Sequence, residues 1–313
     1  MENNSSWIWG IIYYNSADER LFVPKKIGIG ITLNFAHPRA LTFAPFFLIF
    51  ISMLVILLVM IHSGSFDASS LNAELILIFP AVSALLLLVP ALISKFARGA
   101  GIDIALAGWG GMIFIVAMSL QRLLVIPYLN FRGGLSAATA AADIIILSLF
   151  AALAQEMVRY MISDKIIRQK PFEETPRASA ALSLGLGFAA VEIMVLSLKN
   201  IMVCSAAASG DANVWLGVME RFSASLVHVS FSVFIICGIF TGRLRFWLGL
   251  SIALHWLVDF FAGAFSSGLI KIDPYHFEFA LLAFSAVLFA SALGRMDPFA
   301  DGGQKTLPDE ESL

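Results

Sequence analysis

The chain has 313 residues, of which 59% are hydrophobic and only 13% are charged, and its mean hydropathy is +0.87. Soluble domains carry about 25% charged residues, so this composition excludes an ordinary soluble domain. The net charge of -2 excludes the basic footprint that nucleic acid requires. The two cysteines, Cys204 and Cys237, are too few for a disulfide framework.

Residues 1–38 differ from the rest of the chain because they mix aromatic and charged side chains. Lys25 and Lys26 precede a short apolar stretch, a combination that is typical of a segment at the membrane interface. A flexible tail is the alternative. The first apolar stretch lacks the basic start and the cleavage site of a signal peptide, so we expect none.

Long apolar runs dominate residues 39–295, which we expect to form one transmembrane domain. A membrane helix needs roughly 20 apolar residues, because the hydrocarbon core is about 30 Å thick. Such helices satisfy their own backbone hydrogen bonds in lipid, whereas barrel strands alternate over about ten residues. The predicted class is therefore all-α, a polytopic membrane helix bundle. About eight candidate spans are found, at 40–62, 74–95, 103–127, 137–162, 178–199, 222–242, 246–267 and 275–294.

The positive charges in the connections predict the orientation of the bundle. Lys and Arg crowd the link after the fourth span, from Lys165 to Arg177, whereas the loop after the first span, 63–73, has neither. With an even number of spans, both termini then lie in the cytoplasm; Lys199 and Arg221 are exceptions on the other side. Residues 296–313 are rich in Gly, Pro and acids, which predicts a disordered acidic tail.

Most of the candidate spans contain ionisable or amide side chains. Each charge in the bilayer costs about 2.5–3.5 kcal/mol on insertion scales, so it needs a partner or a wet cavity. Together these groups favour one shared polar cavity. The residues concerned are Gln121, Arg122, Asp143, Gln155, Glu156, Arg159, Glu192, His228, His255, Asp259, His276 and Glu278.

Two pairs of these residues share a helix face. Glu156 and Arg159 are three residues apart, and His255 and Asp259 are four apart. A carboxylate beside a histidine fixes its tautomer and raises its basicity. The spacing is equally suited to a general base, a metal ligand or a structural hydrogen bond, and these alternatives stay open.

Several of these segments resemble the motifs of the bacterial YhfC-type intramembrane proteases. Gln155–Tyr160 resembles the family's Glu-Glu-x-x-Arg signature, and Gly185–Glu192 resembles its Gly-x-Gly-His-Gly-Gly-Ile-Glu segment. The other matching segments are Arg122–Pro127 (Arg-x-Pro), Glu220–Arg221 followed by His228, and His255-x-x-x-Asp259. The resemblance runs from about residue 40 to 294, with the motifs in the same order. It implies kinship with the CAAX-processing prenyl endopeptidases and with the anterior-pharynx-defective subunit, the scaffold of gamma-secretase.

The resemblance breaks at two positions that carry the chemistry in proteolytic relatives. The first glutamate of the signature falls on Gln155, and the histidine of the Gly-rich helix falls on Phe188. An amide cannot act as a general base near neutral pH, and a phenyl ring can neither bind metal nor carry a proton. The motif positions that are retained are Glu156, Arg159, His228, His255 and Asp259.

These substitutions lead to our first hypothesis, a non-catalytic protein that binds membrane-protein partners through its polar cavity. Gln-Glu-x-x-Arg and a phenylalanine in the Gly-rich helix are also features of the gamma-secretase scaffold subunit, which however lacks the span near 103–127. Under this hypothesis no cofactor is expected. The partners are the lipid bilayer and another membrane protein, and a homo-oligomer is left open.

The alternative is an active intramembrane endopeptidase with a rearranged site. Glu156 would then be the base, with Glu192, His228 and His255 as ligands of zinc and Asp259 beside the oxyanion. A third class, a transporter, is disfavoured because no broken helices or inverted repeat are evident. An ion coordinated between Glu156, Glu192 and the histidines would favour the enzyme, and direct side-chain pairing would favour the scaffold.

Overall fold

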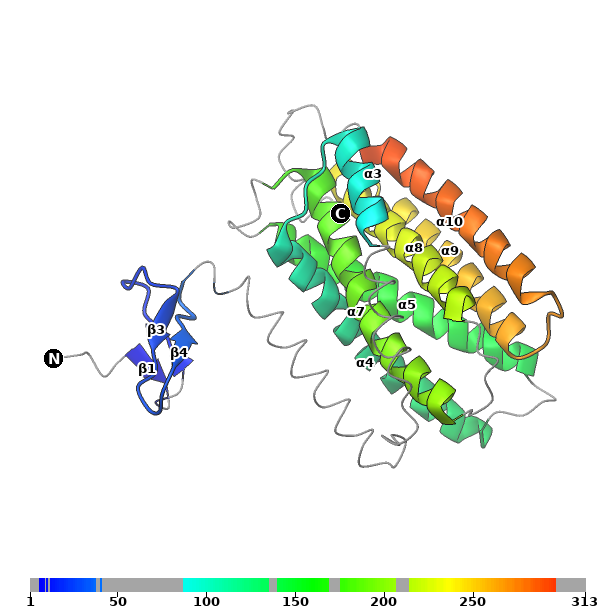
Figure 1. The fold of residues 1–313 in the computed structure, drawn as a ribbon, viewed down its shortest axis with the longest axis horizontal. Coiled ribbons are helices and arrows are strands. Elements are labelled where there is room, and N and C mark those ends of the chain that lie inside the picture. Colours follow the sequence, from blue (N-terminus) through cyan, green and yellow to red (C-terminus); the bar gives the residue numbers. More distant parts are fainter. Residues whose placement is uncertain are drawn as a thin grey trace.

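The computed structural model describes residues 6–8, 10, 12–37, 40, 87–134, 140–168, 175–206 and 214–296. Within these residues the chain is mainly helical (Figure 1). The helices are α3 (Leu88–Arg98), α4 (Ile104–Arg132), α5 (Ala140–Ile167), α7 (Arg177–Ala206), α8 (Val214–Thr241), α9 (Leu244–Ser266) and α10 (Pro274–Met296).

Six of these helices, α4, α5 and α7 to α10, are long and apolar enough to cross a membrane, with mean hydropathies of 1.6 to 2.0. The predicted class, a polytopic bundle of membrane helices, is therefore confirmed. The expected span 40–62, most of the span 74–95 and nearly all of the tail lie outside the described residues. Of the second span the structure describes α3, which has 11 residues, so the count of eight is approximate.

Helix α4 is longer than the sequence predicts. We expected the span to end at Pro127, but the helix continues to Arg132 and ends where Gly133 adopts a left-handed conformation with φ 70°. Proline removes one backbone hydrogen bond, yet membrane helices tolerate it because neighbouring groups satisfy the freed carbonyl. The glycine, rather than the proline, sets the end of the helix.

Helices α7 and α8 form the interior of the bundle. Their apolar windows are 78% and 83% buried, against 17% for α4 and for α9 and 28% for α10. Helix α7 packs on α4 and α8, α8 also packs on α10 and α9, and α5 packs on α9 and α4. Most side chains in these windows of α7 and α8 are therefore buried in the bundle, while those of α4, α9 and α10 are mostly not.

Glycines allow α4 and α7 to approach at backbone contact. A Cβ at Gly110 would lie 2.1 Å from the carbonyl oxygen of Leu184, and one at Gly187 would lie 1.7 Å from that of Ala107. On the other face of α7, a Cβ at Gly185 would lie 2.6 Å from the Cα of Val229. Small residues at helix contacts are the usual means of close packing in membranes. They bring α8, and with it His228, against α7.

The amino-terminal residues form two short hairpins. Strands β1 (Trp7–Ile8) and β2 (Ile12–Tyr13) pair antiparallel, as do β3 (Phe22–Pro24) and β4 (Ile31–Leu33). The buried Asn34 side chain joins them by donating to the carbonyls of Asn15 and Asp18, both at 2.8 Å. These strands were missed because runs of two or three residues are too short for an alternating pattern to show.

Candidate functional site

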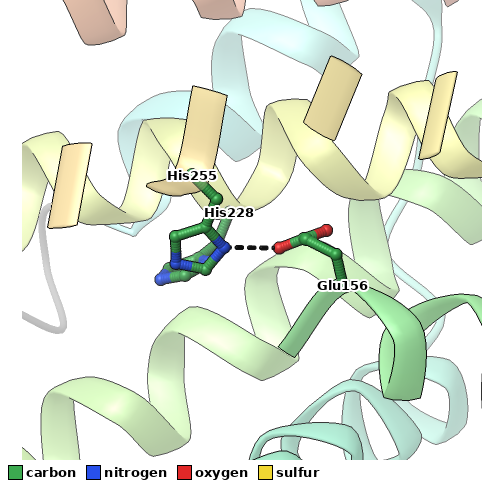
Figure 2. A group of neighbouring side chains, drawn as sticks. All are labelled: Glu156, His228 and His255. Carbon is green, nitrogen blue, oxygen red and sulfur yellow. Dashed lines mark hydrogen bonds and ion pairs between the residues drawn. The ribbon is translucent and has the colours of Figure 1, made fainter. Parts of the chain in front are cut away.

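Three helices bring the retained acidic and histidine side chains together. Glu156 comes from α5, His228 from α8 and His255 from α9. All three are buried, and each has a possible ligand atom within 4.8 Å of the others. Figure 2 shows the Glu156 carboxylate directed at the His255 ring, with the His228 ring beside it. The residues lie far apart in the sequence, so only the packing of the helices creates this cluster.

Glu156 is engaged on both carboxylate oxygens. Its Oε1 lies 2.7 Å from His255 Nδ1 and accepts a hydrogen bond of 3.3 Å from Arg159 Nη2. Its Oε2 forms an ion pair of 3.1 Å with Arg159 Nε, although the angle is too poor for a hydrogen bond. Glu156 is 0% exposed and Arg159 is 1% exposed. The pair is therefore a salt bridge sealed inside the bundle.

The neighbours of His228 define which of its nitrogens carries a proton. Arg159 Nη2 lies 3.0 Å from Nδ1, and because arginine has only donors, Nδ1 must accept. The proton then sits on Nε2, which lies 2.6 Å from Glu192 Oε2. Arg159 Nη1 also donates to the His228 carbonyl at 3.0 Å and to the Ser232 hydroxyl at 2.8 Å. Both nitrogens of His228 are therefore committed to protein partners.

His255 keeps one nitrogen with a weaker contact. Its Nδ1 faces the Glu156 carboxylate, so this nitrogen carries the proton. Its Nε2 lies 3.6 Å from Asp259 Oδ2, which is too long for a hydrogen bond. The Asp259 side chain is 32% exposed. His255 Nε2 and Asp259 are thus the part of the cluster closest to the bundle surface.

Phe188 occupies the position to which the resemblance noted in the sequence assigns a histidine. It is fully buried on α7, and the guanidinium carbon of Arg159 lies 4.0 Å from its ring centre. The His228 ring packs on it at 4.5 Å between centres, and Phe114 meets it edge-on at 5.2 Å. A cation over an aromatic face is stabilising, most strongly where water is excluded. The phenyl ring therefore packs against the Arg159 guanidinium and stabilises its charge.

The remaining site residues lie around this centre. Gln155 is partly buried, and its Oε1 has no hydrogen-bond partner among the described residues. Glu192 links His228 to Arg221, whose Nη1 lies 3.6 Å from Glu192 Oε1; Arg221 also pairs with Glu220. The buried Glu278 lies within electrostatic range of Arg221.

Ser232 was not singled out by sequence, and the role of Arg221 in this network was not foreseen. Ser232 is a hydroxyl acceptor for Arg159. It follows His228 by four residues, so both lie on one face of α8, which is the signal that could have found it. Arg221 was noted for its positive charge and its place in a motif, but not as a partner of Glu192.

Three other polar positions lie away from the cluster. Asp143 is buried and binds the Tyr128 hydroxyl at 2.6 Å and Arg132 at 3.3 Å. Arg122 is exposed. His276 is exposed next to Asp273, and hydrogen bonds from the His276 backbone and ring lower the pKa of the Asp273 carboxyl. The structure therefore divides the predicted polar residues between a central network and positions outside it, with Asp143 and His276 near the starts of α5 and α10 and Arg122 within α4.

The donor types of the cluster fit zinc, but their arrangement does not. Two histidines and a glutamate are a known set for catalytic zinc. Here, however, the permanent cation Arg159 contacts both Glu156 and His228, and neither ring nitrogen of His228 has a free lone pair. Glu192, which we expected as a ligand, is paired with His228 Nε2 instead, at 2.6 Å. A divalent cation could enter only after Arg159 had moved away.

Comparison with known families supports the resemblance noted in the sequence. Residues 200–275 match the sequence model of the YhfC intramembrane metalloprotease family, a stretch that includes His228, His255 and Asp259. Residues 17–41 match a family of unknown function, DUF5808. The searches of curated proteins and of solved structures found no match. The chain is therefore an integral membrane protein with a segment similar to intramembrane metalloproteases.

Proposed function

We propose that this chain is a non-catalytic membrane protein that binds other membrane proteins, with its intramembrane polar network serving to fix the helices. The single observation that carries the proposal is the position of Arg159. Its guanidinium contacts Glu156, His228 and Phe188 at once. Kinship with the scaffold subunit of gamma-secretase is part of this proposal.

Catalysis would require groups that this network keeps occupied. A general base must lie within hydrogen-bond reach of the proton that it removes. Glu156 is 0% exposed and is paired with a cation on both oxygens. His228 donates to Glu192 and accepts from Arg159. Gln155 and Phe188 supply no proton acceptor of suitable basicity.

Partner binding is favoured by Asp259, which is more exposed than the carboxylates of Glu156 and Glu192. Asp259 is 32% exposed on α9, whose apolar window is only 17% buried. An ionisable group that faces lipid is costly, so such groups usually meet a polar partner. His255 Nε2 and the Asp259 carboxylate lie 3.6 Å apart, and both are acceptors. A donor side chain on a partner helix would supply the hydrogen bond that these two groups cannot make to each other.

The decisive experiment is a cleavage assay in vesicles. The purified protein is mixed with a transmembrane peptide, alongside an active intramembrane protease as the positive control. We expect no cleavage by the wild-type chain. Cleavage that is lost in Glu156→Gln would overturn the proposal. A Gln155→Glu, Phe188→His double variant tests whether these two positions account for the lack of activity: cleavage that appears only in this variant supports the proposal.

A second candidate is a metal-dependent endopeptidase, and one observation favours it. His255 Nε2 is not hydrogen-bonded to Asp259, and the matched family is a metalloprotease family. Metal content of the purified protein tests this candidate, with His228→Ala and His255→Ala as controls. About one equivalent of zinc that is lost in both variants would favour the enzyme. Zinc well below one equivalent in the wild type would count against it.

A further inference from the structure

The turn between β3 and β4 is exposed along its whole length. Every residue from Pro24 to Ile31 is exposed. Three of them are isoleucines, Ile27, Ile29 and Ile31, with exposed fractions of 71%, 101% and 63%. Single exposed apolar side chains are common, but a contiguous group of them marks an interaction site. The end of this hairpin therefore has the character of a docking surface.

The backbone of this turn is closed by a hydrogen bond and bent by two glycines. Lys25 N donates to the Gly30 carbonyl at 3.0 Å, which closes the turn. Gly28 and Gly30 have φ values of +86° and +116°, a region that other residues rarely adopt. A Cβ at either glycine would meet nothing within 4 Å. The turn therefore has open space around Gly28 and Gly30, although the Ile27 side chain lies beside Gly10 of the first hairpin: a Cβ at Gly10 would be 3.3 Å from Ile27 Cδ1.

The charge of the turn indicates the chemistry of its partner. Residues 22–35 contain two lysines, Lys25 and Lys26, and no acidic residue. Lysines next to large apolar side chains are the pattern of segments that bind anionic lipid surfaces. Contact between two copies of the turn would bring like charges together, because each copy carries two lysines. This argues against self-association through the turn.

We propose that the β3–β4 turn inserts Ile27 and Ile29 into the headgroup region of the bilayer that the helices span. Lys25 and Lys26 then lie against anionic headgroups. The bilayer is the favoured occupant because the same chain carries six helices able to span it. Because the turn belongs to a chain whose helices are already in the bilayer, its contact with the headgroups is an intramolecular event with a high effective concentration. The β hairpin is a peripheral anchor of the amino-terminal unit, and this role is independent of whether the helical site is catalytic.

Site-directed spin labelling of the full chain in vesicles tests the proposal. A single cysteine replaces Ile29 after Cys204→Ala and Cys237→Ala, and the vesicles contain phosphatidylcholine alone or mixed with phosphatidylglycerol. In the mixed vesicles we expect the label to be shielded from a water-soluble nickel chelate and accessible to oxygen, which partitions into lipid. A label at Ser16, outside the turn, should stay open to the nickel chelate in both. A label on Ile31→Cys, in a variant that keeps Ile29, repeats the accessibility measurement next to the intact isoleucine.

Charge variants provide the matched control. Replacing Lys25 and Lys26 by Gln should lower the partition of the turn into the mixed membrane about 25-fold, at about fivefold per lysine. The label at position 29 should then become open to the nickel chelate, and high salt should act in the same direction. Equal nickel access with and without phosphatidylglycerol would overturn the proposal. So would shielding from both reagents in detergent, since that indicates a protein contact instead of lipid.

Discussion

The guanidinium carbon of Arg159 lies 4.0 Å from the centre of the Phe188 ring, and the His228 ring packs on that same phenyl group. Phe188 stands where the resembling family has a histidine. A protonated histidine at this position would place a second positive charge against Arg159, whereas a phenyl ring offers a negative face. The phenyl ring and the buried arginine therefore suit one another in packing and in charge.

Phe188→Ala should lower the free energy of unfolding by about 3–5 kcal/mol, since it removes a buried ring and leaves a cavity beside Arg159. Unfolding of the detergent-solubilised protein by a denaturing detergent measures the change. Phe246 provides the control because it is 62% exposed on α9, so Phe246→Ala should have little effect. Equal losses in the two variants would mean that Phe188 is not part of a packed core.

Arg159→Met should destabilise the protein by about 3–5 kcal/mol, because it leaves the Glu156 carboxylate buried without its cation. Adding Glu156→Gln to this variant should recover part of the loss, and the double-mutant cycle measures the coupling between the two residues. Arg168 is the matched arginine, since its ion pair with Asp164 is nearer the surface. Arg168→Met should cost no more than about 1 kcal/mol. Purely additive effects at positions 156 and 159 would contradict the sealed salt bridge.

Gly187→Ala should prevent α4 and α7 from packing, because its Cβ would lie 1.7 Å from the Ala107 carbonyl oxygen. Backbone atoms cannot give way as a flexible side chain can, so we expect a loss of folded protein in size-exclusion chromatography. Gly249→Ala on α9 is the control, since its Cβ would meet nothing within 4 Å. It should be neutral or stabilising by up to about 1 kcal/mol through helix propensity. A well-folded Gly187→Ala protein would show that the helices are farther apart than described.

The amino-terminal unit should respond to acid through Asp18. Hydrogen bonds from the Arg20 side chain and backbone, and from the Tyr13 hydroxyl, lower the pKa of the Asp18 carboxyl. Its contribution to stability is then present above the unfolded value of about 3.9 and is lost as the pH falls through the lower folded value. An NMR titration of the carboxyl carbon should show Asp18 ionised below the usual range. Arg20→Gln should shift the titration upward; an unchanged midpoint would contradict this origin.

Part of the site was predictable because helix geometry is local. The pairs Glu156–Arg159 and His255–Asp259 follow from spacings of three and four residues, and the structure has both contacts, at 3.1 and 3.6 Å. The contact of Glu156 with His255 was not predictable, since it joins residues 99 apart in the sequence. The same holds for Arg159 and His228, which are 69 apart.

The sequence by itself determined the class of the protein. Runs of about twenty apolar residues cannot satisfy their backbone in lipid except as helices, and the amide at Gln155 and the phenyl ring at Phe188 can be read from the sequence alone. Only the tertiary structure decided how the polar groups pair. Glycine contacts at Gly110, Gly185 and Gly187 set how closely the helices approach, and that packing places Arg159 between Glu156 and His228. Pair formation of this kind depends on distances and hydrogen-bond directions between helices, which no one-dimensional pattern contains.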